Sequence, residues 1–466
     1  MNNNYDIVVG LEIHAELNSK TKVFCSCENK FGAEPNTLVC PICLGMPGTL
    51  PNIDKKCVEL AIKSGLMTNC KINQNTIFER KNYFYPDLTK SYQISQLISP
   101  LCYDGYVELD SGKKIRIENI HLEEDAGKLV HIGDKSYIDY NRCGVALIET
   151  VTRPDISNAD EAVEFLTKLR NLFIYGDIAN CKLEQGGMRF DVNLSVKPKG
   201  SDKLGVRTEM KNLSSFRSVK HAIEYEANRQ IQVLENGGTI VEETRKWDDG
   251  KNQSLPMRVK DSVNTYRYFP DPDLPQIHIG DQVLEQIKKT IPLSEQQLKS
   301  IYKEKYNLPD YDIGVLVSDK KLSDFFNECI KIYDQPKDLS NWILGELLRN
   351  VKDQINITAE QFVQIINMSN QKLISRTNAV PLIAKVMETG EDPQKLAKEM
   401  DILNTMNDGD LEPIIDKLLS DNPKAIEDYK TNPDKIMTFF TGQIMKQTRG
   451  KANVALAKKL LAEKLG

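Results

Sequence analysis

The chain has 466 residues, of which 40% are hydrophobic and 27% are charged, and this is enough apolar material for two or three domains with cores of their own. The formal net charge of -5 excludes a protein that coats nucleic acid with its whole surface, although a local basic region remains compatible with it. No basic stretch precedes an apolar run near the start, and no segment approaches the roughly 18 consecutive apolar residues that span a membrane. We therefore expect a globular, cytoplasmic protein with no membrane partner.

The first informative segment is residues 8–17, in which polar and apolar residues alternate. The alternation predicts a strand with Glu12, His14 and Glu16 on one face and apolar residues on the other. A half-exposed strand shows the same alternation without binding anything, so this segment alone favours a solvated surface over a set of ligands.

Four of the ten cysteines crowd into one short segment. Cys25 and Cys27 form one close pair, and Cys40 and Cys43 form a Cys-x-x-Cys pair, a spacing typical of tetrahedral zinc held by four sulfurs. Four protein ligands close the coordination sphere, so the zinc is expected to stabilise the fold and not to catalyse. The alternatives are four unligated thiols or a redox-active disulfide.

Residues 81–93 combine lysines, tyrosines and a Pro-Asp turn signal. We expect a loop here that could contact phosphate, ribose or a stacked adenine. The alternative is an ordinary aromatic-rich loop that packs on its own domain.

Acidic residues recur downstream in segments of different character, and the ones that matter are Glu123, Glu124, Glu149, Asp191 and Glu209. Neighbouring carboxylates repel one another unless a cation lies between them. Oxygen ligands with one imidazole suit magnesium or manganese, and such a site can neutralise phosphate charge during phosphoryl transfer. No Gly-x-x-x-x-Gly-Lys-[Ser/Thr] motif occurs, so an ATP site in this chain would not be a P-loop.

The rest of the chain predicts an α+β protein, with strands first and helices after them. Residues 188–197 and 205–211 read as an antiparallel hairpin, and a helix should begin after Ser214 or Ser215 and end at Gly237. The proline-rich segment 266–275 can form neither a helix nor a central strand. Helical patterns follow from about residue 285, and the last of them carries a basic end: Lys446, Arg449, Lys451, Lys458, Lys459 and Lys464.

Several ordered segments give the chain a family resemblance that runs nearly from end to end. They are Val9-Gly10-Leu11-Glu12-Ile13-His14, Phe31-Gly32-Ala33-Glu34-Pro35-Asn36-Thr37, Cys40-Pro41-Ile42-Cys43-Leu44-Gly45-Met46-Pro47-Gly48, Arg80-Lys81-Asn82-Tyr83-Phe84-Tyr85-Pro86-Asp87, Tyr92-Gln93-Ile94-Ser95-Gln96, Leu122-Glu123-Glu124-Asp125-Ala126-Gly127-Lys128, Lys211-Asn212-Leu213-Ser214-Ser215-Phe216 and Tyr266-Arg267-Tyr268-Phe269-Pro270-Asp271-Pro272-Asp273-Leu274. With them, the chain resembles the B subunits of the aspartyl/glutamyl-tRNA(Asn/Gln) amidotransferases. Its tail, residues 440–453, is similar to that family's YqeY-like domain.

The resemblance implies an ATP-dependent enzyme that works with two partner subunits. The glutaminase, or A, subunit would hydrolyse glutamine, and the C subunit would brace it against the B subunit. The B subunit would phosphorylate the side-chain carboxylate of mischarged Glu-tRNA(Gln), Asp-tRNA(Asn) or both. Ammonia channelled from the glutaminase would then displace phosphate and leave the amide. The family's layout implies a strand-rich catalytic cradle domain over residues 1–290, a helical domain over 291–404 and a small helical, tRNA-binding tail over 405–466.

The resemblance also assigns residues to roles. The catalytic pocket would contain Glu12, His14, Glu123, Glu124, Glu149, Asp191 and Glu209, with Lys81, Tyr83 and Lys90 on the loop beside the substrate and the ammonia exit. Magnesium would bind Glu12, His14, Asp191 and Glu209, and the nucleotide site would include Glu12, Asp191, Glu209 and Lys211. Zinc would bind Cys25, Cys27, Cys40 and Cys43.

Two other functions are compatible with parts of the pattern. A zinc-stabilised tRNA-binding scaffold without catalysis would have no use for Glu12, His14, Asp191 and Glu209 together, and all four are present. An activator that makes an adenylate, as a glutamyl-tRNA synthetase does, should carry His-Ile-Gly-His and Lys-Met-Ser-Lys-Ser signatures, which are absent. The sequence therefore favours the catalytic role within the amidotransferase.

Overall fold

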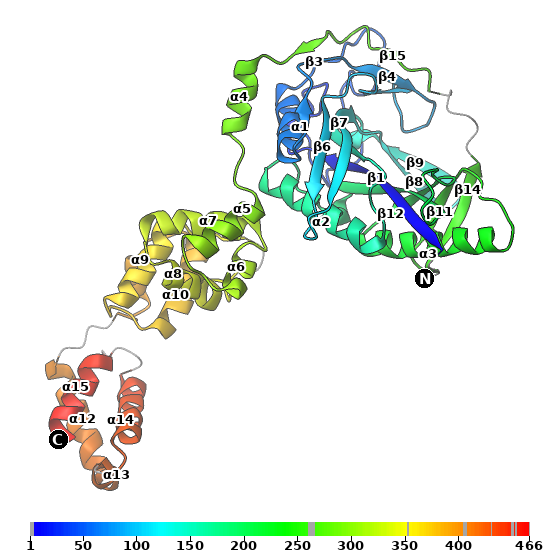
Figure 1. Ribbon diagram of the computed structural model, residues 1–466. Coiled ribbons are helices and arrows are strands. Elements are labelled where there is room, and N and C mark those ends of the chain that lie inside the picture. The colour runs from blue at the N-terminus through cyan, green and yellow to red at the C-terminus, as the bar shows by residue number, and fades with distance from the viewer. Residues whose placement is uncertain are drawn as a thin grey trace. The chain divides into compact units, whose positions relative to one another are not determined.

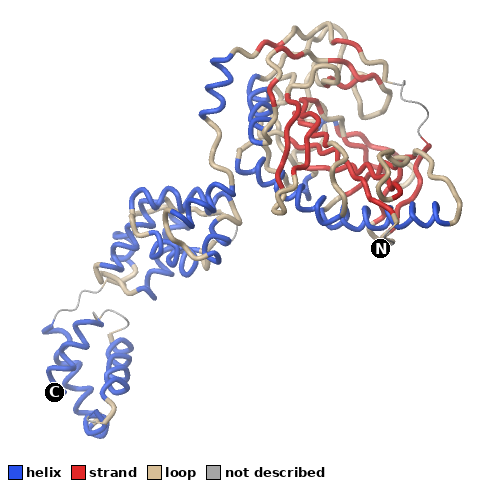
Figure 2. The backbone as a smooth tube through the Cα atoms, in the orientation of Figure 1, coloured by secondary structure: helices blue, strands red, loops and turns tan. Residues whose placement is uncertain are grey.

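A computed structural model describes residues 4–259, 266–351, 354–403, 408–429, 431–448, 452 and 454–465. The chain divides into two compact units, Met1–Glu295 and Gln296–Gly466. The first is mixed and the second is helical (Figures 1 and 2), so the predicted α+β class is confirmed. The predicted boundary between residues 404 and 405 lies outside the described residues, and the division into three domains stays a prediction.

A nine-stranded sheet is the frame of the first unit. Its strands, in spatial order, are β14 (Gln253–Val259), β13 (Glu243–Asp248), β12 (Thr208–Leu213), β11 (Met188–Pro198), β1 (Tyr5–Glu16), β10 (Ala146–Thr152), β7 (Lys114–Glu124), β6 (Cys102–Glu108) and β2 (Lys71–Ile72). Neighbouring strands of this sheet are antiparallel apart from β12 and β13, which run parallel. The predicted hairpin is therefore confirmed as the pair β11 and β12.

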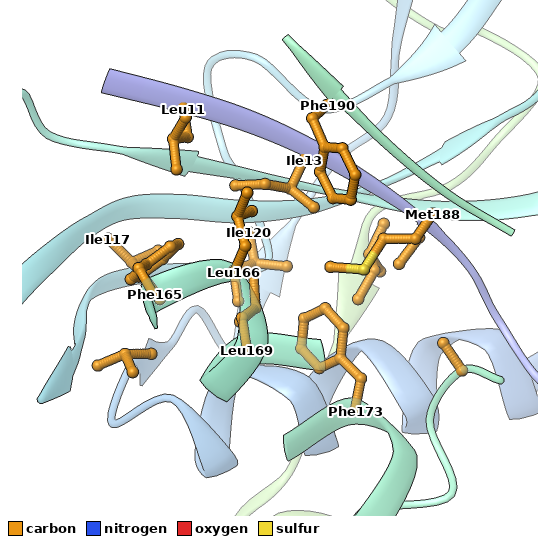
Figure 3. Packing of buried hydrophobic residues seen from close by; sticks show 14 of the residues in the cluster. Leu11, Ile13, Ile117, Ile120, Phe165, Leu166, Leu169, Phe173, Met188 and Phe190 are labelled. Atoms are coloured by element: carbon orange, nitrogen blue, oxygen red, sulfur yellow. The ribbon is translucent and has the colours of Figure 1, made fainter. Parts of the chain in front are cut away.

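Three helices cover the apolar face of this sheet: α1 (Lys55–Met67), α2 (Ala159–Tyr175) and α3 (Phe216–Glu235). Alternation along β1 sends Leu11 and Ile13 into the core, where both are buried. Figure 3 shows them facing Phe165 and Leu169 of α2, which lie on one side of that helix at helical spacing. Burial of this face leaves the opposite face of the central strands free for polar side chains.

Helix α3 starts where the sequence predicts. Ser215 is the N-cap residue, and its side chain accepts a hydrogen bond from the backbone N–H of Ser218. Ala222, Ile223 and Ala227 are buried against the sheet. The crossover through α3 is long enough to make the next strand, β13, parallel to β12.

Shorter strands form a second layer over the polar face. The strands β15 (Phe269–Pro270), β4 (Glu79–Asn82) and β5 (Tyr92–Ser95) make one small sheet, and β16 (Ile277–His278) with β3 (Asn75–Thr76) and β8 (Lys128–Ile132) with β9 (Lys135–Asp139) make two others. In Figure 1, β4 and β15 lie on the other side of the large sheet from α2 and α3. The segment 81–93 is therefore a hairpin with a loop only at its centre, where the sequence led us to expect a loop throughout.

The proline-rich segment 266–275 returns to this second layer. Its short strand β15 pairs with β4 at one edge, which agrees with the prediction that it forms neither a helix nor a central strand. The helix α4 (Asp281–Lys289) follows it in the first unit.

The second unit is built of helices, as predicted. They are α5 (Glu295–Glu304), α6 (Asp310–Leu316), α7 (Lys320–Ile332), α8 (Pro336–Trp342) with a π-helical turn at Ile343–Leu347, α9 (Ala359–Asn370), α10 (Arg376–Thr389), α11 (Pro393–Glu399), α12 (Asp408–Asp421), α13 (Pro423–Tyr429), α14 (Pro433–Gln447) and α15 (Val454–Leu465). The helices α12, α14 and α15 share a core of their own around Leu411, Phe440 and Leu461. None of the described helices combines the length and the apolar character that a membrane span requires.

The predicted basic end is exposed where it can be seen. Lys446, Lys458, Lys459 and Lys464 are all at the surface of α14 and α15. Arg449 and Lys451 lie outside the described residues.

Candidate functional site: two acidic clusters in one cavity

A cavity of about 760 Å³ lies between the polar face of the large sheet and the second layer. Side chains of β12, β11, β1, β10 and β7 form its floor, and Lys81, Tyr83 and Tyr266 contribute its opposite wall. The predicted site residues among those that line it are Glu12, His14, Lys81, Tyr83, Glu123, Glu149, Asp191, Glu209 and Lys211. Strand register brings these residues together, because directly opposed residues of neighbouring strands point to the same face.

The first acidic cluster consists of Glu12, Asp191 and Glu209. Glu12 on β1 is opposite Asp191 on β11, and an oxygen of each of the three carboxylates lies within 4.8 Å of one from each of the others. Lys211 Nζ lies 2.6 Å from Asp191 Oδ2 and 3.0 Å from Glu209 Oε1. The Asn193 side-chain amide donates to Glu12 Oε1 at 2.9 Å.

The second acidic cluster consists of His14, Glu123 and Glu149, which also approach one another within 4.8 Å. His14 is opposite Glu149, and its Nε2 lies 3.2 Å from Glu123 Oε1 and 3.6 Å from Glu149 Oε2. His121 faces the same group, with Nε2 at 3.2 Å from Glu149 Oε2. The four residues predicted to bind one magnesium therefore divide between two neighbouring clusters, with His14 in the second.

Burial and mutual repulsion set the protonation of these groups. Burial raises the pKa of Glu12, and the carboxylates of Glu149 and Glu209 raise it further. Burial disfavours the His14 imidazolium, but hydrogen bonds to Glu123 and Glu149 outweigh this and raise its pKa to about 10. The pKa of the Glu149 carboxyl falls well below its usual range because the hydrogen bonds from His121 and His14 outweigh its burial. Both clusters thus concentrate negative charge that protons or cations must balance.

The donor atoms fit hard divalent cations. The first cluster offers carboxylate oxygens alone, and the second offers carboxylate oxygens with one imidazole, which are the ligands that Mg²⁺ and Mn²⁺ prefer. Converging carboxylates in a partly buried site repel one another strongly, and a cation at either cluster would relieve that repulsion.

The wall opposite the clusters is cationic and aromatic. Lys81 is on β4, and its Nζ lies 5.1 Å from the centre of the Tyr266 ring. Burial would lower the pKa of Lys81, but Glu123 and other neighbouring groups raise it, so the side chain is an ammonium. Burial raises the pKa of Tyr83 to about 12, so its phenol keeps its proton. These groups could bind an anionic or polar part of a ligand in the cavity.

Lys90 and Glu124 pair with each other beside the cavity and do not line it. The Lys90 ammonium donates to Glu124 Oε1, which also accepts the Ile94 backbone N–H at 3.0 Å. The Glu124 side chain is only 5% exposed. Glu123 and Glu124 are consecutive on β7, so their side chains point to opposite faces of that strand, and only Glu123 belongs to an acidic cluster.

The four predicted cysteines come together. Their Sγ atoms lie within 4.8 Å of one another, close enough to hold one metal ion. The buried Lys22 donates to Leu38 O at 2.8 Å and lies 3.6 Å from Cys43 Sγ. The hydrogen bond from the Cys25 thiol lowers the pKa of Cys43, and the Cys40 amide and Lys22 act in the same direction. All ten cysteines of the chain are free thiols.

Three polar residues of the cavity region were not predicted as site residues. His121 contacts the second cluster, and Arg189 lines the cavity with its Nη2 at 3.0 Å from Asp125 Oδ2. A signal for His121 and Arg189 was present, since His121 is two residues from Glu123 and Arg189 is two residues from Asp191, which places each on the cavity face of its strand.

Comparison with known proteins explains this arrangement. A family model described as the GatB/GatE catalytic domain matches residues 7–285, which include both acidic clusters and the four cysteines, and a GatB domain model matches residues 324–465. The chain belongs to the GatB/GatE family. The resemblance stated from the sequence is thereby confirmed.

Curated members of the family match over nearly their full length. The chain is 49% identical to the B subunit of the aspartyl/glutamyl-tRNA(Asn/Gln) amidotransferase of Caldicellulosiruptor bescii and 44% identical to that of Carboxydothermus hydrogenoformans. It is 41% identical to the protein numbered B 1 among these subunits in Clostridium acetobutylicum. Each alignment covers 99% of this chain and 99% of the relative. Family membership therefore applies to the whole chain.

Proposed function

We propose that this chain is the tRNA-dependent kinase and amidotransferase subunit of a glutamine-hydrolysing ligase. The observation that carries the proposal is the pair of acidic clusters on one floor of the cavity, opposite the Lys81 and Tyr83 wall. Its substrates would be ATP and the aminoacyl end of mischarged Glu-tRNA(Gln), Asp-tRNA(Asn) or both. The products would be Gln-tRNA(Gln) or Asn-tRNA(Asn), ADP and phosphate.

The reaction proceeds in two steps. A side-chain carboxylate oxygen of the aminoacyl group attacks the γ-phosphorus of ATP, the bond to the β,γ-bridging oxygen breaks, and ADP leaves. Ammonia then attacks the carbonyl carbon of the acyl phosphate, phosphate leaves with the electron pair of the C–O bond, and nitrogen loses a proton. The first step is needed because a carboxylate is a poor acyl donor, whereas phosphate is a good leaving group.

Glu12, Asp191 and Glu209 would hold one Mg²⁺, and His14, Glu123 and Glu149 would hold a second. Magnesium at these positions supplies charge neutralisation for the polyphosphate. Lys211 adds an ammonium beside the first cluster and is suited to a nucleotide phosphate. Lys81 can bind the substrate carboxylate from the facing wall, and Lys90 with Glu124 lies where the resemblance places the ammonia exit.

The four cysteines would hold zinc in a closed tetrahedral site. Their place outside the cavity lining supports a structural role. The zinc would fix the segment between β1 and α1, where the described residues 18–54 form turns and bends in place of regular helices or strands.

The assembly we propose is a heterotrimer in which this chain joins a glutaminase, the A subunit, and a bracing partner, the C subunit, and acts on tRNA in the cytoplasm. The relatives are named as the B component of an amidotransferase, and this supports the presence of partner subunits. The exposed lysines of α14 and α15 support contact between the tail and tRNA, because lysines bind phosphate without sequence preference.

A charge-only substitution tests the function. Glu12→Gln or Asp191→Asn removes one negative charge from the first cluster with little change in shape, and each should abolish ATP-dependent transamidation in the complex reconstituted with the glutaminase and the bracing partner. Glu108→Gln is the matched control, because Glu108 is an exposed carboxylate on β6 of the same sheet. Full activity of either cluster variant, with the heterotrimer intact, would contradict the proposal.

A further inference from the structure

Thr244 lies immediately behind the first acidic cluster. It is on β13, directly opposite Glu209 in the parallel pairing of β12 and β13. Its hydroxyl donates a hydrogen bond of 2.9 Å to Glu209 Oε2. Thr244 is 2% exposed and does not line the cavity, so it can act on a bound cation only through Glu209.

We propose that Thr244 is the positioning residue that sets the Glu209 carboxylate for a divalent cation in the first acidic cluster. The inference deepens the proposed function and rests on the cation site assigned there. It adds a residue that neither the sequence pattern nor the resemblance had singled out.

The geometry around Glu209 explains why positioning is needed. The Glu209 side chain has three rotatable bonds, and its carboxylate could turn away from the negative charges of Glu12 and Asp191. Thr244 fixes Oε2, while Oε1 lies 3.0 Å from Lys211 Nζ, the same ammonium that lies 2.6 Å from Asp191 Oδ2. Hydrogen bonds to a ligating carboxylate commonly tune metal affinity in this way.

The strand that carries Thr244 is itself held rigidly. The neighbouring Arg245 donates from Nε to Ser254 Oγ at 2.8 Å and from Nη1 to Glu243 Oε1 at 2.6 Å. Ser254 in turn donates to the fully buried Glu226 of α3 at 3.1 Å. This buried polar network links β13 and β14 to α3, so the Thr244 hydroxyl has little freedom to follow Glu209 if the carboxylate moves.

The test measures cation binding directly on the purified full-length chain. Mn²⁺ is the probe, its free concentration is followed by electron paramagnetic resonance, and Glu209→Gln identifies which of the binding events belongs to the first cluster. Thr244→Val keeps the shape of the side chain and removes the hydroxyl, and we expect Mn²⁺ to bind that site about 10- to 100-fold more weakly. Thr244→Ser retains the donor and should stay within a few-fold of the unsubstituted chain.

Thr150→Val is the matched control. Thr150 is a fully buried threonine on β10 of the same sheet, and its hydroxyl has no hydrogen-bond partner among the described residues. Its substitution should leave Mn²⁺ affinity unchanged. If Thr244→Val does not fold, Thr244→Ala removes the same hydroxyl with a smaller side chain and serves in its place.

The outcomes separate the two levels of the argument. If Glu209→Gln weakens binding and Thr244→Val does not, the positioning role is wrong and the cation site stands. If Glu209→Gln itself leaves Mn²⁺ binding unchanged, the proposed cation site is wrong. Equal losses in Thr244→Val and Thr150→Val would show general loosening of the sheet and would also overturn the positioning role.

Discussion

Replacement of Arg80 by methionine should destabilise the first unit through one buried ion pair. Arg80 on β4 binds two acids of the proline-rich segment: its Nε lies 2.9 Å from Asp271 Oδ2 and its Nη2 lies 2.6 Å from Asp273 Oδ2. The guanidinium also stacks 4.2 Å from the centre of the Tyr92 ring. These contacts fasten β15 to β4, next to Tyr266 and Lys81 of the cavity wall.

The magnitude follows from the burial of the partner. The Asp271 side chain is 0% exposed and that of Arg80 is 16% exposed, so Arg80→Met leaves a carboxylate without its cation in a place that water does not reach. Loss of one member of a buried pair typically costs about 3–5 kcal/mol of unfolding free energy. This is a large share of the roughly 5–15 kcal/mol that stabilises a typical protein.

The assay is urea denaturation of Arg80→Met, Asp271→Asn and the double variant. The double variant should be less destabilised than the sum of the two single changes, because no unpaired charge remains buried. Arg153→Met is the matched control: its Nη2 lies 3.4 Å from Asp104 Oδ1, both side chains are more than 40% exposed, and its loss should cost below about 1 kcal/mol. Additive effects of the two single changes, or equal effects of Arg80→Met and Arg153→Met, would refute the reasoning.

Three further predictions concern the metal, the tail and one helix. Elemental analysis of the purified chain should find about one zinc, and Cys43→Ser should lower that content; a chain free of zinc would leave the thiols unligated. Ending the chain after Leu403 removes α12 to α15 with their shared core, and should weaken tRNA binding more than ATP binding in paired titrations; an unchanged tRNA affinity would argue against the tail's role. Ser215→Ala removes the side-chain cap of α3 and should lower the free energy of unfolding by about 1 kcal/mol, whereas Ser201→Ala, in a turn, should have a smaller effect in the same denaturation series.

The sequence predicts local structure well wherever a pattern repeats. Alternation along residues 8–17 predicts which face of β1 is buried, because an apolar face must pack and a polar face must not. The cap at Ser215 and the glycines after residue 236 predict both ends of α3. The cysteine spacing predicts the four-sulfur group, because both pairs lie on tight local turns.

The composition of the acidic clusters could not be predicted from one sequence. It depends on strand order and register, which place Glu12 opposite Asp191 and His14 opposite Glu149 although these segments lie far apart in the chain. Alternation shows only that Glu123 and Glu124 face opposite ways, and not which of them meets His14. Thr244 was missed because a buried threonine has no sequence signature, and its role comes from the parallel strand that α3 delivers beside Glu209.

The assembly of the first cluster from distant strands has a consequence during synthesis. The cysteine group is complete once Cys43 has left the ribosome, but Glu12 has no partner until β11 and β12 have been made and paired, and Glu209 has no support until β13 arrives. A nascent or truncated chain that ends before residue 244 would carry zinc and still bind magnesium poorly. Ligand binding at the cavity therefore stabilises the first unit as a whole, so that a thermal shift with Mg²⁺ and ATP reports completion of the sheet, whereas zinc content reports only its first strand and the loop that follows.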